Sequence, residues 1–154
     1  MIENYLKELN ISYELLEHEA VFTVAQATNL KNKIAGEGCK NLFLKSDTSA
    51  YYIYILPDNI KADIKALEKF LNIKKLHFAS ILELEKILSL HQGGVTPLGI
   101  INDTNNLVKV IIDKSLVNKT LLMHPEVNTK TLAIKYNDLI KYIEHLNHEY
   151  LIFS

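Results

Sequence analysis

A lysine in an apolar run is the first candidate for chemistry in this 154-residue chain. Lys45 ends the run CKNLFLK, in which the two-residue period of a strand puts it on the same face as Asn41 and Phe43. An ammonium group is costly to bury without a partner or a ligand, so Lys45 is a candidate anion-binding residue. The residues alone favour the simpler interpretation, a solvated lysine on an edge strand.

A glycine-rich segment at residues 93–99 is the second candidate. Three of the five glycines of the chain and one proline fall within these seven residues, so the backbone there adopts a shape that side chains would forbid. Such a segment can direct consecutive N–H groups at an anion or an oxyanion. A structural turn between a helix and a strand is an equally good interpretation. The candidate residues are Gly93, Gly94, Val95, Thr96 and Pro97.

Three histidines need separate interpretations. His124 closes a predicted strand among polar neighbours, where sites often lie, although an isolated histidine is more often structural. His145 and His148 are three residues apart and could share a metal ion, but no further ligands follow at diagnostic spacing. We therefore interpret them as a solvated helix end and predict no metal site.

Cys39 and a row of lysines complete the candidates. Cys39 lies beside Lys40 and could be an activated thiol, although a small buried hydrophobic residue is the favoured interpretation. The lysine row is favoured as a solvated helix face, with contact to RNA as the alternative. It comprises Lys61, Lys65, Lys69, Lys74 and Lys75.

The elements that must position these residues follow from periodicity and capping signals. Two capping boxes, Thr23 to Gln26 and Ser80 to Glu83, mark helix starts. Helices are predicted at residues 2–9, 24–31, 63–71, 80–88 and 137–146. Strands are predicted at 12–17, 39–45, 51–56, 75–78, 107–113, 120–123, 131–134 and 150–153, with 39–45 and 51–56 as a hairpin. Without regular strand–helix alternation, this order indicates an α+β fold with a central mixed sheet in one domain, residues 1–154.

Composition excludes several classes of function. The 17 basic residues are all lysines, and with 18 acidic residues they give a net charge of −1. A broad sequence-reading DNA binder is therefore not expected, although a small footprint on the end of a nucleic acid is compatible with a few local lysines. No apolar run approaches the roughly 20 residues of a membrane span. A single cysteine and an opening without signal-peptide order lead us to expect a cytoplasmic protein.

Five segments together resemble the YbaK/prolyl-tRNA-editing family of aminoacyl-tRNA deacylases. The order and spacing agree along nearly the whole chain, and the match is most similar to the free-standing deacylases that clear alanine mischarged on proline tRNA. The segments are HEAVFT at 18–23, GCKNLFLK at 38–45, GGVTPLG at 93–99, IND at 101–103 and HPEVNT at 124–129.

The resemblance implies a curved, barrel-like mixed sheet flanked by helices and an ester hydrolase that uses no metal, cofactor or covalent nucleophile. It implies that Lys45 holds the aminoacylated terminal adenosine, that the loop at 93–97 lies against the ester, and that His124 lines the amino-acid pocket. Phe22 and Thr23 would lead into a helix beside that pocket. The implied substrate-binding residues are Phe22, Thr23, Asn41 and His124.

The implied partner is the acceptor end of an aminoacylated tRNA, most simply proline tRNA mischarged with alanine, with transient contact to prolyl-tRNA synthetase. Gly38 and Gly94 stand where relatives often carry His and Ser, so a roomier pocket could also admit serine. Two other readings stay open. One is a catalytically silent module on the same fold that senses aminoacyl-tRNA or amino acids, and the other is a cysteine hydrolase that uses Cys39.

Overall fold

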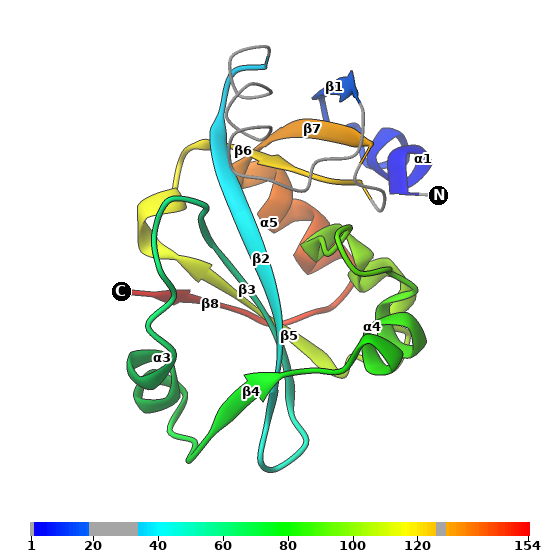
Figure 1. The fold of residues 1–154 in the computed structure, drawn as a ribbon. Helices are drawn as coiled ribbons and strands as arrows, with labels where there is room; N and C mark the ends of the chain where they lie inside the picture. The colour runs from blue at the N-terminus through cyan, green and yellow to red at the C-terminus, as the bar shows by residue number, and fades with distance from the viewer. Residues whose placement is uncertain (1, 19–33, 126–128) are drawn as a thin grey trace.

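The computed structural model describes residues 2–18, 34–125 and 129–154, and it confirms the predicted α+β class (Figure 1). No helix among these residues is long and apolar enough to cross a membrane. The helices are α1 (Ile2–Glu8), α3 (Ile64–Leu71), α4 (Ile81–Leu88) and α5 (Tyr136–His145), with 3₁₀ helices η1 (Pro97–Asn102) and η2 (Lys114–Leu116). The strands are β1 (Tyr13–Glu17), β2 (Glu37–Ser46), β3 (Tyr51–Pro57), β4 (Leu76–Phe78), β5 (Val108–Asp113), β6 (Thr120–Met123), β7 (Lys130–Lys135) and β8 (Tyr150–Phe153).

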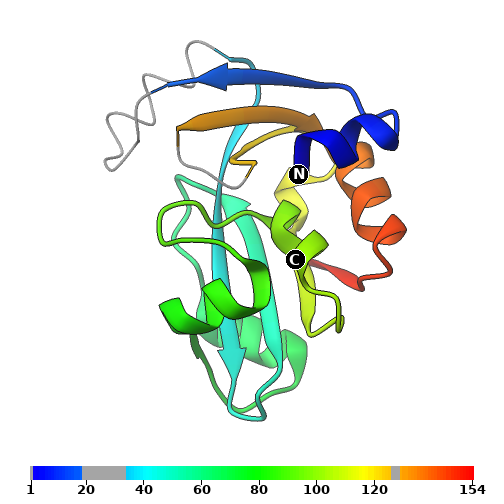
Figure 2. The ribbon, with the colours of Figure 1, turned by 90° about the vertical axis from the view of Figure 1, so that its right-hand side faces the viewer.

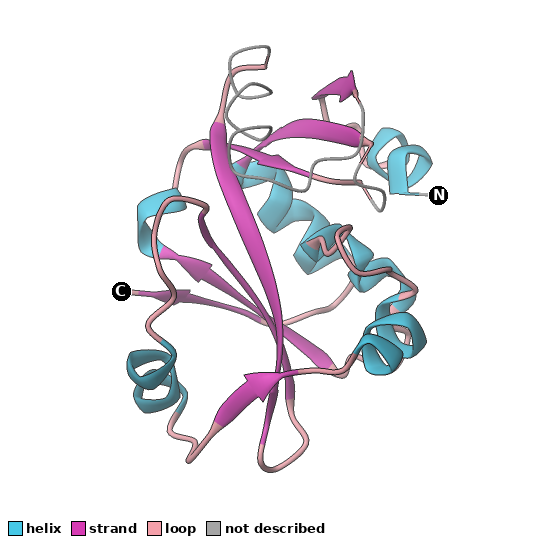
Figure 3. Cartoon of the chain, viewed as in Figure 1, coloured by secondary structure: helices cyan, strands magenta, loops and turns pink. Residues whose placement is uncertain are grey.

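Strand β2 connects the two halves of an eight-stranded mixed sheet. The strand order is β1-β7-β6-β2-β3-β5-β8, and β4 also pairs with β2. The start of β2 runs parallel to β6, with Gly38 opposite Leu122, and its end runs antiparallel to β4, with Lys45 opposite His77. Along its length it forms the predicted hairpin with β3. Figure 3 shows β2 as a long strand that crosses the molecule from β6 to β4.

Apolar residues cover both faces of this sheet. Phe43 belongs to a large core that also contains Leu6 of α1, Leu88 of α4 and Leu139 of α5. The next residue, Leu44, belongs to a second cluster beneath α3. Because neighbouring side chains of a strand point to opposite faces, β2 contributes to both clusters. Figure 2 shows α1 and α5 close together at one side of the sheet.

Most predicted elements are present within a residue or two of their expected bounds. The capping box at Ser80 is confirmed, with both of its hydrogen bonds. Sequence patterns missed η1, because the glycine-rich segment was predicted to continue as a turn through residue 99. In the structure the turn ends at Thr96, whose hydroxyl accepts from the Leu98 N–H and caps η1. The predicted helix at 24–31 lies outside the described residues.

Candidate functional site

Lys45 lies in an internal strand, so the edge-strand interpretation is wrong. It pairs with Tyr51 of β3 on one side and with His77 of β4 on the other. Its side chain is 26% exposed. The Lys45 side chain is therefore mostly covered by its neighbours and only partly open to solvent.

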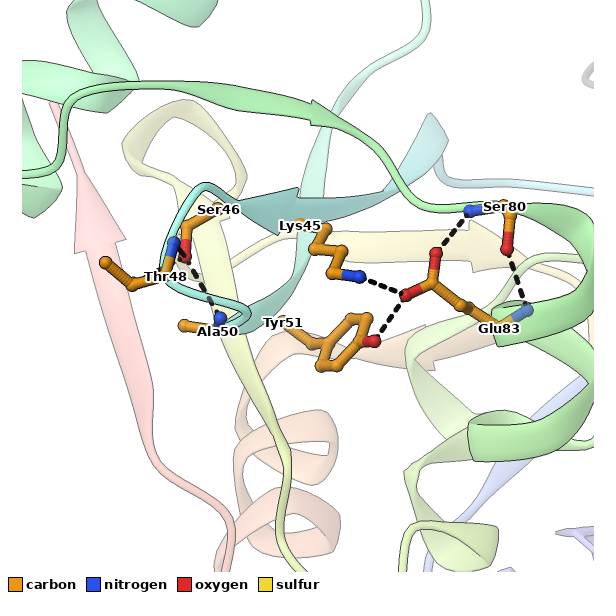
Figure 4. Close-up of polar contacts among 7 residues, drawn as sticks. All are labelled: Lys45, Ser46, Thr48, Ala50, Tyr51, Ser80 and Glu83. Atoms are coloured by element: carbon orange, nitrogen blue, oxygen red, sulfur yellow. Dashed lines mark hydrogen bonds and ion pairs between the residues drawn. The ribbon is translucent and has the colours of Figure 1, made fainter.

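Glu83 of α4 holds this ammonium group in place (Figure 4). Lys45 Nζ lies 2.8 Å from Glu83 Oε2 and 5.5 Å from the centre of the Tyr51 ring. The Tyr51 hydroxyl donates to the same carboxylate oxygen. Hydrogen bonds from Lys45, Tyr51 and Ser80 lower the pKa of Glu83 to about 2, and the bond to Glu83 raises the pKa of Lys45. The pair is consequently ionised throughout the neutral range.

The position of Glu83 is itself fixed by the start of α4. Glu83 N–H donates to Ser80 Oγ at 3.1 Å, and Ser80 N–H donates to Glu83 Oε1 at 2.9 Å. This reciprocal pair is a capping box, which satisfies two otherwise free donors of the helix terminus. On the other side of Lys45, Ser46 Oγ accepts from the Ala50 N–H at 3.0 Å and closes the β2–β3 turn (Figure 4). Lys45 thus lies between the capped start of α4 and the hydrogen-bonded β2–β3 turn.

Asn41 connects β2 to the glycine-rich loop. Its Nδ2 donates to the Val95 carbonyl at 3.1 Å, while its Oδ1 is buried and has no partner among the described residues. Both residues line a pocket of about 270 Å³ with largely apolar walls. The other lining residues are Leu42, Phe43, Phe78, Ala79, Ser80, Ile81, Leu84 and Gln92. The pocket therefore combines two predicted site residues with an unused hydrogen-bond acceptor.

The glycine-rich loop has the strained backbone that its composition predicts. Gly93 has φ +90°, a conformation that L side chains rarely adopt. Gly94 N–H donates to the His91 carbonyl at 3.0 Å. Within the described part of the chain, the N–H groups of Val95 and Thr96 have no hydrogen-bond acceptor. Val95 lines the pocket described above, whereas Thr96 is fully buried, so of the two only Val95 lies beside that pocket.

Three polar contacts anchor η1, the helix that follows the loop. The Tyr142 hydroxyl of α5 donates to the Leu98 carbonyl at 2.5 Å, and Asn102 Nδ2 donates to the Leu88 carbonyl at 3.0 Å. Just after η1, the buried Asp103 carboxylate accepts from the N–H groups of residues 107 and 108 at 3.1 and 2.8 Å. The carboxyl end of the loop is therefore fixed to α4, α5 and β5.

His124 lies at the end of β6 in a different environment. Its Nδ1 lies 2.6 Å from the Lys130 carbonyl, which can only accept, so Nδ1 carries the proton. Burial lowers the pKa of His124, the Lys130 carbonyl opposes this, and the neighbouring His18 lowers the pKa further. The two imidazole centres are 6.2 Å apart. His124 is accordingly neutral at pH 7, with Nε2 as an acceptor.

The structure separates the predicted site residues onto two faces of β2. Gly38 pairs with Leu122, and Lys40 and His124 each follow two residues later, so strand alternation gives both the same side of the sheet. This is the face opposite to Asn41 and Lys45. We call the side with Asn41, Lys45 and the 93–97 loop the loop face, and the side with Lys40 and His124 the histidine face. In the sequence Lys40 was notable only as the neighbour of Cys39. Strand alternation nevertheless predicts that Lys40 and Lys45 lie on opposite faces of the strand.

The remaining candidates receive structural roles or lie outside the described residues. Cys39 Sγ donates to the Glu37 carbonyl at 3.3 Å, and its side chain packs against the core. The interpretation of His148 as solvated is wrong, because it is buried and donates from Nδ1 to the Val108 carbonyl at 2.8 Å. Among the described residues, no three His, Cys, Asp or Glu side chains are grouped to hold a metal ion. Phe22 and Thr23 are outside the described ranges.

Most of the chain is similar to proteins of one family. Residues 18–142 match the family model of the aminoacyl-tRNA editing domain. The chain is 35% identical over 141 residues to the prolyl-tRNA editing protein ProX of Acetoanaerobium sticklandii, covering 90% of this chain and 86% of that protein. It is 30% identical over 156 residues to the prolyl-tRNA synthetase associated domain-containing protein 1 of Danio rerio, covering 99% and 85%. A solved structure of a candidate trans-editing enzyme for prolyl tRNA synthetase has the same fold, with a TM-score of 0.75 at 14% identity, covering 97% and 91%.

Proposed function

The chain belongs to the aminoacyl-tRNA editing domain family and is an aminoacyl-tRNA deacylase, and from this premise we propose that it hydrolyses alanine from mischarged proline tRNA. The names of the relatives support the proline system, because they refer to prolyl-tRNA editing and to prolyl-tRNA synthetase. Action in trans implies that the synthetase releases the mischarged tRNA, so contact with the synthetase would be transient.

The single observation that carries the proposed mechanism is the anchored loop beside the pocket. Asn41 holds the Val95 carbonyl, and no acceptor within the described residues takes the Val95 N–H. We propose that this N–H stabilises the oxyanion that forms when water attacks the ester carbonyl. One such donor is worth about 10²–10³ in rate. The 2′-hydroxyl next to the ester can assist the water, so no covalent nucleophile is needed.

Lys45 is proposed to hold the terminal adenosine of the substrate. Glu83 neutralises most of its charge, so Lys45 contributes a fixed ammonium donor more than a long-range attraction for RNA. With no arginine in the chain, a positioned lysine is the available cationic donor.

His124 is proposed to line the amino-acid pocket as a neutral acceptor. Its unprotonated Nε2 suits the α-ammonium group of an aminoacyl ester. Because His124 lies on the histidine face and Lys45 on the loop face, and the α-ammonium group is only a few bonds from the ester carbonyl, this role of His124 is an alternative to an ester on the loop face. Variants from each face distinguish the two.

Selectivity against proline is proposed to rest on size. A synthetase site built for proline cannot strongly reject alanine, because a missing methylene costs only roughly 1–3 kcal/mol. A second site that admits only the smaller residue corrects the error. We propose that the small residues Gly38 and Gly94 enlarge the pocket enough to admit serine as well.

The test is loss of the ester from alanyl-tRNA(Pro) in buffer containing EDTA, with prolyl-tRNA(Pro) and seryl-tRNA(Pro) alongside. We expect rapid loss of alanine and sparing of proline. Equal rates for alanine and proline would refute size exclusion, and abolition by EDTA would refute a metal-free reaction. Binding without hydrolysis would favour a silent sensing module, the alternative function. Cys39→Ala should remain fully active, and a loss of about 10³ without unfolding would indicate covalent catalysis instead.

A further inference from the structure

Three large apolar side chains are exposed together where β4 leads into α4. Phe78 is 65% exposed, Ile81 51% and Leu82 73%. They fall within five consecutive residues, around the Ser80 cap, and we call them the Phe78 patch. Phe78 is the last residue of β4, and Ile81 and Leu82 are the first two of α4, which follows β4 directly in Figure 1.

The fold does not require these side chains. Helix α4 is held by Leu84 and Leu88, which are buried in the main core. Strand β4 is held by its backbone pairing with β2 and by the buried Leu76. Apolar surface of this kind, unused in packing, is typical of a contact site.

The Phe78 patch is continuous with the pocket on the loop face. Phe78 and Ile81 line that pocket together with Asn41 and Val95. A molecule that extends out of the pocket in this direction must pass over the patch. Phe78 and Ile81 thus form one wall of the proposed ester site, and Leu82 follows Ile81 in the chain outside the lining.

We propose that the Phe78 patch binds the unpaired nucleotides that precede the ester-bearing adenosine of the tRNA. This inference rests on the proposed function, in which the ester lies against the 93–97 loop. Bases stack on an exposed aromatic ring whatever their sequence, and the aliphatic side chains extend the apolar support. Three exposed lysines on the same segment, Lys74, Lys75 and Lys86, supply cations for the phosphates.

The size and charge of the surface favour RNA over a protein partner. A specific protein interface usually buries about 800 Å² on each side, far more than three side chains offer. Successive nucleotides, in contrast, bind through one ring and a few cations at a time.

The experiment compares two substrates, alanyl-tRNA(Pro) and alanyl-adenosine, which keeps the ester but lacks the preceding nucleotides. For Phe78→Ala we expect KM for alanyl-tRNA(Pro) to rise roughly 5- to 150-fold, the range that 1–3 kcal/mol of stacking gives. Any change with alanyl-adenosine reports the effect of Phe78→Ala on the pocket wall itself, and it should be clearly smaller than the change with alanyl-tRNA(Pro). Phe78→Trp should restore KM, whereas Phe78→Leu, which is apolar but cannot stack, should not. Leu107→Ala is the matched control, because Leu107 is 49% exposed and is not a lining residue of the pocket.

Several outcomes would overturn the inference. An unchanged KM for alanyl-tRNA(Pro), or an equal loss with both substrates, would show that Phe78 does not bind the preceding nucleotides. A loss confined to binding of prolyl-tRNA synthetase would identify the patch as a protein interface. If the parent protein hydrolyses neither substrate, the proposed function fails. The inference is then decided by the affinity for uncharged proline tRNA, which must fall on removal of its unpaired 3′ nucleotides in the parent but not in Phe78→Ala.

Discussion

Polar side chains near the core are stabilised differently on the loop face and on the histidine face of β2. On the loop face, Lys45 and Glu83 are ionised and compensate each other, and the pKa of Glu83 falls to about 2. On the histidine face, burial lowers the pKa of His124, and the ring remains neutral with one nitrogen bonded to a backbone carbonyl. The first region therefore offers a fixed charged donor, and the second a fixed neutral acceptor.

The difference arises from one property of a strand, the alternation of its side chains. Lys40 and Lys45 are five residues apart on β2, and an odd separation puts them on opposite faces. Two lysines of the same strand thus point to different sides of the sheet. Variants from each face distinguish on which side of β2 the ester is hydrolysed.

Lys45→Ala should lower the rate of ester hydrolysis by at least about 10², because it removes the positioned donor proposed to hold the terminal adenosine. The fold should survive, since Glu83 keeps its bonds to Tyr51 and Ser80 and is partly solvated. Single-turnover deacylation with circular dichroism measures both effects. Lys40→Ala is the matched variant from the other face. If Lys40→Ala is inactive while Lys45→Ala is not, the ester lies on the histidine face.

Gly93→Ala should reduce activity less, by about tenfold or more. Its φ of +90° is a backbone conformation that an added Cβ makes costly, by roughly 1–2 kcal/mol. The loop should shift and misdirect the N–H group of Val95. We expect kcat to fall and KM to change little in a steady-state assay. Full activity would mean that residues 93–96 form only a turn.

Sequence patterns predicted the elements well and the grouping of site residues less well. The β2–β3 hairpin and the Ser80 capping box depend on neighbouring residues, so local propensity was enough to predict them. The Lys45–Glu83 pair joins β2 to α4 across 38 positions of the chain. Periodicity and capping signals extend over only a few residues, so they could not predict this contact. Likewise, the separation of His124 from Lys45 depends on the parallel register of β2 with β6, which only the assembled sheet determines.

If His124 on the histidine face takes part in the reaction, the rate of deacylation should depend on pH through its protonation. Because burial lowers its pKa below 6.5, His124 is mostly neutral at pH 7 and gains its proton at lower pH than an ordinary histidine. The part of the activity that uses its Nε2 as an acceptor should therefore fall as the pH is lowered below 6.5. Uncatalysed ester loss must be subtracted at each pH. His124→Gln, which keeps an acceptor but does not titrate, should be less active and lack the acid limb. An acid limb that persists in this variant would have to come from another group.

The smallest effect is expected from Glu83→Gln, which removes the negative charge of the loop face and leaves that of Lys45. Glutamine can serve in the capping box, so the start of α4 should be retained and the change isolates the ion pair with Lys45. The pKa of Glu83 is depressed from 4.5 to about 2, so its stabilising contribution is complete above pH 4.5 and is lost as the pH falls toward 2. The urea midpoint of the parent should therefore exceed that of Glu83→Gln by a constant small amount at pH 5–7, and the difference should shrink between pH 4.5 and 2. Added salt should reduce it as well, since the pair is about a quarter exposed. A difference that stays constant down to pH 2 would mean that Glu83 acts through packing and capping, and Lys45 would then be held without help from its charge.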